Sequence, residues 1–412
     1  MKILCVFGRH NYGDPQRGAG YEYTNFLPAL ERLGHQIAFF ESFDRNAWSG
    51  FPDLNRSLLA TVEREQPDVV LCVLMGYEVW SETIDLIRAL RGPILINWST
   101  DDSWKYREFS RLIARHFDLY VTTDERAFIR SRRDGLDNFV LSQWAANAAA
   151  LAAPKPAAQC GVPVSFVGTA YGNRPAWIAQ LRGRGIDVQC FGHGWPRGAV
   201  PADEIPRIVR DSVISLNFGD SPPMRRTAGA GPAGRQIKAR IFEVPGAGGF
   251  LITEAVNGIE RYYVPGQEIA VFEGLDDLVA KIRHYLAHPD ERDAAALRAF
   301  ERTRREHTYD LRFADLLQRA STARAAHSEE DHKAMPRRID WTGFGQAQAK
   351  HSLGPGLRLL RALLLLPFCA VWGRRRGPRA ARRALFEISW RLAGSRTYSA
   401  AGLPGRLFYE HS

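Results

Sequence analysis

The chain has 412 residues, which is more than one hydrophobic core usually supports, so two domains and an additional segment are expected. Its hydrophobic content of 45% and charged content of 24% are typical of a soluble globular protein. The net charge of +10 is unevenly placed, because residues 333–412 hold 15 Lys and Arg against 3 acidic residues. The rest holds 40 basic and 42 acidic residues. Without a stripe of basic and aromatic residues, this nearly neutral body is not expected to bind nucleic acid.

The five cysteines, Cys5, Cys72, Cys160, Cys190 and Cys369, have no Cys-x-x-Cys spacing. Four of them lie in or beside apolar, strand-like runs, where a free thiol behaves as a small hydrophobic side chain. The sequence therefore predicts neither a disulfide framework nor a zinc site. The N-terminus has the pattern of a buried strand rather than of a secretory signal, so a reducing, cytoplasmic location is expected.

The first half of the chain alternates apolar runs with helical spacers. Strands are expected at 1–7, 36–40, 68–74, 93–98 and 119–123, and helices through Phe26–Leu33, at 81–90 and at 108–115. A further short helix and strand complete this half. Continuous runs of Val, Ile and Leu separated by helices predict a parallel sheet that is covered on both faces.

Residues 145–163 are rich in Ala and Pro and are expected to link two domains. The alternation then restarts, with strands expected at 164–167, 188–191, 213–216 and 250–253 and helices at 176–182, 205–210, 278–286, 291–305 and 311–319. The sequence therefore predicts an α/β protein with two Rossmann-like, doubly wound domains, 1–150 and 160–322, which face a cleft. Ligands are expected at the carboxyl ends of the strands. Residues 323–412 would form a basic, partly apolar helical tail.

A glycine-rich loop from Gly8 to Gly20 connects the first expected strand to the first helix. In such folds this turn offers backbone N–H groups to an anion at a helix N-terminus. Gly18 and Gly20 are therefore candidates for contact with a phosphate or an acceptor sugar. The loop lacks the Gly-x-Gly-x-x-Gly spacing, so a connection without a ligand is the alternative.

Two further candidates follow strands of the second half. Arg174 begins a helix just after the strand that ends at Gly168, where a guanidinium group and the helix end would neutralise a diphosphate. A surface arginine at a helix start is the alternative. The next strand ends in CFGHGW, in which His193 would either line the cleft or belong to a tight turn.

The segment KARIFEVPGAGGFLITE, residues 238–254, carries the strongest signal. Lys238 and Arg240 supply positive charge, and Gly246 and Gly248 would permit close approach of a ligand to the backbone. Glu243 stands between an apolar pair and a Pro-Gly, a poor place for an unpaired carboxylate, and would accept hydrogen bonds from two ribose hydroxyls. The two cations share a face if the segment is extended but diverge if it is helical. A surface salt bridge before a turn is the alternative.

In the first half, Asp101 and Asp102 directly follow a strand in NWSTDDSW. They are placed for a general base or for a clamp on a sugar hydroxyl. They would equally well cap the next helix. The spacing is not Asp-x-Asp, and no cluster of His and acidic residues nearby suggests a metal site. Leaving-group charge would then be met by Arg, Lys and helix ends rather than by Mg²⁺.

The order of these motifs resembles a known family. The series VSFVGTAYGNR, CFGHGW, KARIFEVPGAGGFLITE, YYVPGQEIAVFEGLDDL and HTYDLR, with NWSTDDSW before it, resembles the CgeB-like (spore maturation protein B) branch of the GT-B glycosyltransferases. The resemblance covers residues 1–318, about three quarters of the chain. It implies a twin-Rossmann glycosyltransferase whose second domain holds most of the sugar nucleotide.

Related retaining enzymes carry a Glu-x7-Glu pair, and the second glutamate contacts the nucleotide ribose. Glu243 matches that second position, but Arg235 stands eight residues upstream, where the first glutamate would lie. This departure leaves the retaining outcome undecided and the hexose contact unassigned. Arg174 and Lys238 resemble the cationic positions that such enzymes aim at the diphosphate.

The tail begins with the apolar stretch LRLLRALLLLPFCAVW, residues 357–372. Only residues 362–372 are free of charge, and this is too short for a bilayer span of about 20 residues. Six arginines follow between residues 374 and 383. An apolar helix with dense arginine is typical of an anchor on an anionic membrane surface, as for an enzyme with a lipid-linked acceptor. A tail packed on the body or on a partner protein is the alternative.

The sequence therefore predicts a metal-independent glycosyltransferase of hexosyltransferase type. It would move a sugar from a nucleoside-diphosphate sugar to a polysaccharide, lipid-linked or protein acceptor, without a cofactor. A sugar-nucleotide epimerase can use the same architecture, but it needs several acids or a histidine in the cleft and turns over without an acceptor. A catalytically inactive scaffold that binds a glycan or nucleotide at the membrane is the third possibility.

Overall fold

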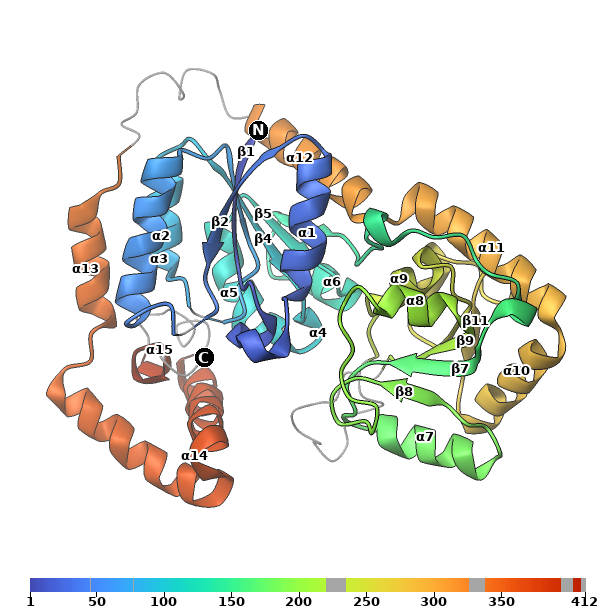
Figure 1. Ribbon diagram of the computed structural model, residues 1–412. Helices are drawn as coiled ribbons and strands as arrows, with labels where there is room; N and C mark the ends of the chain where they lie inside the picture. Colours follow the sequence, from blue (N-terminus) through green and yellow to red (C-terminus); the bar gives the residue numbers. More distant parts are fainter. Residues whose placement is uncertain (45, 77, 220–234, 326–337, 394–402, 409–412) are drawn as a thin grey trace.

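The computed structural model describes residues 1–44, 46–76, 78–219, 235–325, 338–393 and 403–408. Two parallel β-sheets lie within these residues, and helices cover both faces of each (Figure 1). The strand order is β2-β1-β3-β4-β5-β6 in the first sheet and β11-β10-β9-β7-β8 in the second. Every strand pair is parallel. The expectation of two doubly wound α/β halves is therefore confirmed.

The strands of the first sheet are β1 (Lys2–Phe7), β2 (Gln36–Glu41), β3 (Val69–Cys72), β4 (Ile94–Ser99), β5 (Leu119–Thr122) and β6 (Phe139–Leu141). The helices between them are α1 (Tyr21–Arg32), α2 (Phe51–Glu65), α3 (Ser81–Arg88), α4 (Asp102–Lys105), α5 (Arg111–Ile113) and α6 (Glu125–Arg133).

The strands of the second sheet are β7 (Val162–Val167), β8 (Gln189–Phe191), β9 (Ser212–Asn217), β10 (Leu251–Glu254) and β11 (Ala270–Phe272). Its helices are α7 (Arg174–Gly183), α8 (Ile205–Arg210), α9 (Arg240–Gly246), α10 (Leu275–Ala287) and α11 (Pro289–Glu306). The chain continues with α12 (Tyr309–Ala325), α13 (Trp341–His351), α14 (Pro355–Ala393) and α15 (Leu403–Phe408).

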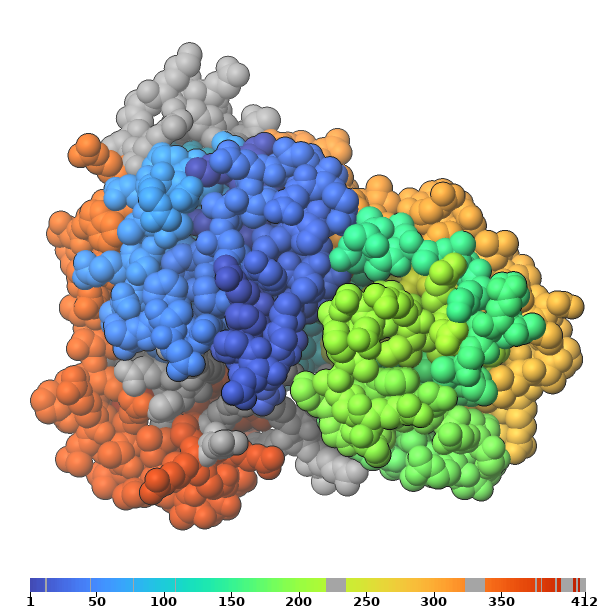
Figure 2. Space-filling model, in the orientation of Figure 1, coloured from blue at the N-terminus to red at the C-terminus, as the bar shows by residue number. Residues whose placement is uncertain are grey.

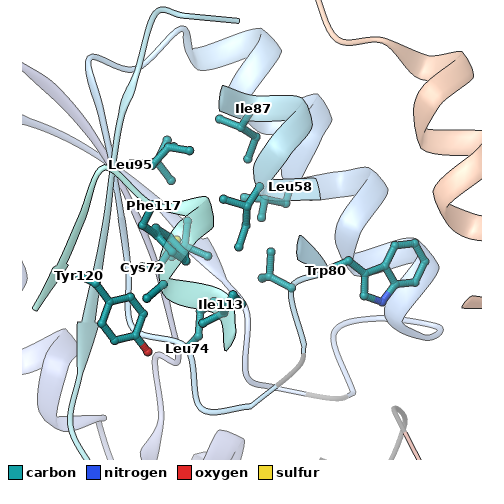
Figure 3. Packing of buried hydrophobic residues seen from close by; sticks show 14 of the residues in the cluster. Leu58, Cys72, Leu74, Trp80, Ile87, Leu95, Ile113, Phe117 and Tyr120 are labelled. Atoms are coloured by element: carbon teal, nitrogen blue, oxygen red, sulfur yellow. The ribbon is translucent and has the colours of Figure 1, made fainter. Parts of the chain in front are cut away.

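Strand β1 illustrates why the first sheet is buried on both faces. Successive side chains of a strand point to opposite faces, so Ile3 and Cys5 pack with α1 and α12, whereas Leu4 packs with α2 and α3. Figure 3 shows the second of these clusters, in which Leu58 of α2 and Ile87 of α3 face the sheet. A continuous apolar run is therefore required here, rather than the alternating pattern of a strand with one wet face.

Each sheet contains a point at which the direction of winding reverses. Strand β1 lies between β2 and β3, and strand β7 lies between β8 and β9. In open α/β sheets such switch points leave a crevice outside the carboxyl ends of the strands, where ligands bind. A ligand site is therefore expected in the segments that follow β1 and β3 and in those that follow β7 and β9.

Two stretches of chain connect the domains and run side by side. Residues 142–161 leave the first sheet and residues 306–309 return to it. The backbone N–H of Ala146 donates to the carbonyl of His307 at 2.8 Å, and that of Tyr309 donates to Ala146 at 3.1 Å. The two segments that connect the domains are thus hydrogen-bonded to each other at the domain border.

Helix α12 lies on the first sheet, although residues up to 322 were assigned to the second domain. Tyr309, Phe313 and Leu316 are buried in the same cluster as Phe26 of α1. The end of the second domain therefore lies before residue 309. The reason is that the apolar side of α12 covers part of a sheet face that α1 alone leaves open.

The tail begins on the body of the protein and then leaves it. Phe344 of α13 is buried in the same cluster as residues of α2 and α3, on the outer side of these helices (Figure 1), so residues 341–351 belong to the first domain. In contrast, Pro355–Arg374 of α14 is long and apolar enough to cross a membrane by length and composition, which holds for no other helix in the described ranges. The expectation that this segment is too short to span a bilayer is wrong by that criterion, because the helix continues through Arg358 and Arg361.

Candidate functional site

Two arginines converge at the carboxyl end of β7. The guanidinium carbons of Arg174 and Arg240 lie 5.3 Å and 5.5 Å from the ring centroid of Phe166, the aromatic residue at the end of that strand. Arg174 is buried, lies 4.2 Å from the ring centroid of Tyr171, and donates from Nη1 to the carbonyl of Thr169 at 2.9 Å. Two cationic side chains that both approach the ring of Phe166, beside the N-terminus of α7, form a candidate site for an anion.

Arg240 is positioned from both strands that flank the second switch point. Its Nη1 donates to Oδ1 of Asn217, at the end of β9, at 3.3 Å, and its Nη2 lies against Gly168, just after β7. Burial lowers the pKa of Arg240, although the negative charge of Glu243 opposes this shift. Arg240 is half-buried, and a cation that has lost part of its hydration is stabilised by an added anion.

Glu243 faces the first domain. It lies on α9, is half-buried, and accepts a hydrogen bond from the hydroxyl of Tyr21, the first residue of α1. The Tyr21 hydroxyl also lies 2.9 Å from that of Tyr309. Burial raises the pKa of Glu243, while the charge of Arg240 and the hydrogen bond from Tyr21 oppose the rise. The carboxylate predicted from sequence therefore lies at the domain border, next to one of the two arginines.

The domains meet along this border. A second contact joins Nη2 of Arg261, after β10, to Oε1 of Glu125, at the start of α6, at 2.5 Å. Figure 2 shows the blue first domain directly against the green second domain. The carboxyl edges of the two sheets thus contribute residues to the same region.

The loop that carries His193 is packed onto the arginine site. The carbonyl of His193 accepts from the backbone N–H of Ala170 at 2.8 Å, and Nε1 of Trp195 donates to the carbonyl of Gly168 at 2.7 Å. A Cβ on Gly192 would collide with the Gly168 carbonyl, so glycine is required there. The His193 side chain itself is exposed, which leaves it able to contact a ligand.

Lys238 and the two glycines of the 238–254 segment have different positions. Lys238 is half-buried and lies in the turn before α9, whose first residue is Arg240. Gly246 and Gly248 are not at the site. A Cβ on Gly246 would lie 2.6 Å from Cβ of Ala146, and one on Gly248 would lie 2.5 Å from the carbonyl oxygen of Ala152. Both glycines pack against the interdomain connection, because the turn between α9 and β10 is at the amino edge of the sheet. Their assignment as ligand-binding residues is therefore wrong.

The loop after β1 is closed by Asn11, whose side chain donates to two backbone carbonyls of the loop. Gly20 is buried directly before α1, and a Cβ there would lie 2.9 Å from the carbonyl oxygen of Gly8. Its role is the close return of the chain. Gly18 is exposed, with a φ of 77° and open space around it. Of these two glycines, Gly18 is therefore the one whose backbone is open to a ligand.

The two aspartates after β4 differ in accessibility. Asp101 is partly buried and precedes α4, but its side chain makes no capping hydrogen bond. Asp102 is buried, and its Oδ1 accepts from the hydroxyls of Ser99, at 2.7 Å, and Ser110. Burial raises the pKa of Asp102, with these hydrogen bonds opposing the rise. A carboxyl enclosed in this way has no open path to a substrate, so Asp102 supports the structure and Asp101 remains the catalytic candidate.

A group of charged residues at the first switch point was not among the candidates predicted from the sequence. Glu22, in the first turn of α1, lies near Asp101 and Lys105, and burial together with the charge of Asp101 raises its pKa. Lys105 donates to the carbonyl of Met75, and the buried Glu78 accepts from the backbone N–H groups of Met75, at 2.6 Å, and Gly76, at 2.7 Å. Glu22 comes just after the Gly8–Gly20 loop, and Lys105 directly follows NWSTDDSW, which was the available signal.

A carboxylate is also present near the position where the resemblance implied one. Arg235 pairs through Nε with Oε1 of Glu254 at 3.0 Å, and Oε2 of Glu254 accepts from the backbone N–H of Gly219 at 2.9 Å. Glu254 is buried at the carboxyl end of β10. The arginine that replaces the first glutamate thus neutralises another acid at the same edge. In the described ranges, no group of three or more His, Cys, Asp and Glu is placed to hold a metal ion.

Part of the chain matches a protein family. Residues 174–318 match a family described as glycosyl transferase-like, and this range begins at Arg174 and contains Arg240 and Glu243. It covers about a third of the chain. A search of proteins with curated functions found no match.

Solved structures share the fold. The sucrose-phosphate synthase of Thermosynechococcus elongatus superposes with a TM-score of 0.57 at 11% identity, over 78% of this chain and 100% of that chain. HepE of Anabaena in complex with UDP and glucose gives a TM-score of 0.48 at 12% identity, over 78% of this chain and 100% of that chain. A glycosyltransferase of Rickettsia africae gives a TM-score of 0.49 at 12% identity, over 79% of this chain and 99% of that chain.

The protein therefore has the GT-B fold, with two Rossmann-like domains and a helical C-terminal region. The finer resemblance to the CgeB-like branch stays a prediction.

Proposed function

We propose that the protein is a glycosyltransferase that moves a sugar from a nucleoside-diphosphate sugar to a polysaccharide, lipid-linked or protein acceptor. The observation that carries this proposal is the convergence of Arg174 and Arg240 over Phe166, with Glu243 one turn further along α9. The match of residues 174–318 to a glycosyl transferase-like family supports it, since that range includes all three charged residues.

In this proposal the second domain holds the donor. Arg174, Arg240 and Lys238 bind the diphosphate, and their charge, with the N-terminus of α7, stabilises it as it leaves. Glu243 accepts hydrogen bonds from ribose hydroxyls. Because a carboxylate has several acceptor positions on its two oxygens, Glu243 can hold a ribose hydroxyl while it keeps the bond from Tyr21.

The first domain holds the acceptor in this proposal. Asp101 or Glu22 removes the proton from the acceptor hydroxyl, whose oxygen forms the new bond to the anomeric carbon as the bond to the diphosphate breaks. Burial raises the pKa of Glu22, which is the direction expected of a general base. Metal independence is part of the proposal, because two or three cationic side chains can meet the leaving-group charge.

The experiment that tests the proposal is a thermal-shift screen of the full chain with UDP, GDP, TDP and CDP sugars. One nucleotide series is expected to raise the melting temperature, and Glu243→Gln is expected to reduce the shift. Glu260→Gln, an exposed glutamate of the same domain, is the matched control. If the donor is converted into its epimer when no acceptor is present, the result would favour an epimerase. A shift with neither hydrolysis nor transfer would favour an inactive binding protein.

A further inference from the structure

The longest helix of the tail is bent into a hairpin. Within α14 the backbone of Gly373 is non-helical, with φ 72° and ψ 166°, so two arms meet there. The arms fold back on each other at the bend, because a Cβ on Gly377 would lie 2.7 Å from Cα and Sγ of Cys369. Glycine is therefore needed at both positions, once for the bend and once for the close approach of the arms.

The hairpin has an inner and an outer apolar face. The inner residues pack around Ala381 and around Leu407 of α15, and they are Leu353, Leu357, Leu364, Leu365, Phe368 and Leu385. The outer residues are 38–84% exposed, and they are Leu359, Leu360, Leu363, Leu366, Val371, Trp372, Ile388 and Leu392. An apolar surface of this extent on a helical pair that projects from the body marks an interaction site.

The positive charge of the hairpin indicates which kind of partner binds it. Residues 355–393 contain nine arginines and one acidic residue, Glu387. A protein partner of ordinary composition would have to bury or neutralise these arginines, whereas an anionic lipid surface accepts apolar side chains and arginine together. The two kinds of residue also meet at the bend, where the exposed Trp372 is followed by the exposed Arg374 and Arg376.

We propose that the α14 hairpin holds the protein on an anionic lipid bilayer and lies in the plane of the membrane interface. The first arm alone is long enough to cross a bilayer. It does not cross in this arrangement, because the second arm packs back on it and would carry Arg382 and Arg383 into the hydrocarbon. The apolar outer face enters the lipid, and the arginines contact the head groups.

The hairpin is attached firmly to the first domain through α13. The ring of His351 stacks on Trp80 with centroids 4.2 Å apart, and its Nε2 lies 3.0 Å from Oε2 of Glu82. Burial would raise the pKa of Glu82, but the hydrogen bond and charge of His351 outweigh it and lower that pKa to about 2. The root of the tail is therefore a hydrogen-bonded, packed contact.

This attachment determines which part of the protein faces the lipid. Figures 1 and 2 show α14 and α15, in orange and red, below the first domain, on the side to which the loop after β1 projects. The carboxyl edge of the first sheet would then lie near the membrane. Here the inference rests on the proposed function, and it favours the lipid-linked acceptor among the three classes.

The test is flotation of the full chain with preformed vesicles of phosphatidylcholine, with and without phosphatidylglycerol. We expect binding to the anionic vesicles and release by salt. The double variant Leu363→Glu, Leu366→Glu is expected to lose binding by about tenfold or more, and Arg374→Gln, Arg376→Gln to lose it only on anionic vesicles. Leu286→Glu, Leu297→Glu, at exposed positions of α10 and α11, is the matched control. Circular dichroism and the melting temperature verify that each variant is folded.

A second measurement separates an in-plane hairpin from a span. A membrane-impermeant thiol reagent is added outside intact vesicles that carry the bound protein. The variant Arg374→Cys is expected to be labelled more than the unsubstituted chain. Reaction only after lysis would mean that the helix spans the bilayer and would overturn the proposal. Equal binding to vesicles with and without phosphatidylglycerol would also overturn the proposal. So would a chain that binds neither vesicle type but forms dimers that the double variant Leu363→Glu, Leu366→Glu disrupts. Because flotation needs no donor, the proposal and the glycosyltransferase function can fail separately.

Discussion

The guanidinium group of Arg240 lies on the backbone of Gly168, so closely that a Cβ there would be 2.5 Å from Nη2. Asn217 holds the other side of the same group at 3.3 Å. One cation is thus positioned from the ends of β7 and β9, the two strands beside the switch point. A change at Gly168 should therefore act on anion binding through Arg240.

Gly168→Ala is expected to displace Arg240 and to weaken nucleoside-diphosphate binding about tenfold. Overpacking of this kind costs about 1–3 kcal/mol of folding free energy. Isothermal titration calorimetry and chemical denaturation measure the two effects. Gly183→Ala, at the end of α7 with open space around it, is the control and should change neither quantity appreciably. Unchanged binding in Gly168→Ala would contradict the placement of the anion.

Arg240→Ala is expected to weaken binding of the nucleoside diphosphate by about 2 kcal/mol, the usual contribution of a hydrogen bond to a charged group. Binding of the corresponding nucleoside, which has no phosphate, should hardly change. The two titrations together distinguish a phosphate contact from a general loss of structure. Arg207→Ala, at an exposed position of α8, serves as the control. An equal loss for nucleoside and nucleoside diphosphate would assign Arg240 a different role.

Glu243 is expected to make stability depend on pH. Burial raises its pKa above the ordinary 4.5, so the folded protein holds this proton more tightly than the unfolded chain. The resulting stabilisation is fully present below pH 4.5 and is lost as the pH rises through the folded pKa. Glu243→Gln should therefore gain melting temperature relative to the parent between acid and neutral pH, while it loses donor binding. Melting curves across this range measure the gain, and a difference that does not vary with pH would refute the cause. Glu260→Gln should show no such trend.

Tyr21→Phe removes the hydroxyl that joins α1 to Glu243 and Tyr309. We expect a loss of about 1 kcal/mol in the free energy of unfolding, together with faster amide exchange at the domain border. Donor binding should persist, because Glu243 keeps its carboxylate. Tyr23→Phe on the same helix is the matched control. Loss of donor binding in Tyr21→Phe alone would mean that the tyrosine itself contacts the ligand.

The proposed use of arginine and lysine in place of a metal can be tested with a chelator. The thermal shift caused by the donor should persist in EDTA and should not increase when Mg²⁺ is restored, because the cationic side chains meet the diphosphate charge. A donor shift that disappears in EDTA and returns with Mg²⁺ would contradict this part of the proposal.

Local sequence predicted most strands, because a strand buried on both faces must be a continuous apolar run, as at Ile3–Phe7. Prediction from local sequence was less successful where a helix and an extended segment fit the same residue pattern. Helix α2 was not expected, although Leu54, Leu58 and Val62 are spaced for one apolar face. The segment around Arg240 and Pro245 could be extended or helical, and only the packing of α9 made it a helix.

The sequence by itself determined the two doubly wound halves, the basic tail, and the candidates Arg174, Arg240 and Glu243, because composition and period are local properties. Only the tertiary structure decided that Gly246 and Gly248 contact the domain connection, that Asp102 is enclosed, and that α12 covers the first sheet. It also brought Tyr21 to Glu243 across 222 residues. Such relationships depend on which sheet edge a turn occupies and which face a helix covers, and both are set by contacts between residues far apart in the chain.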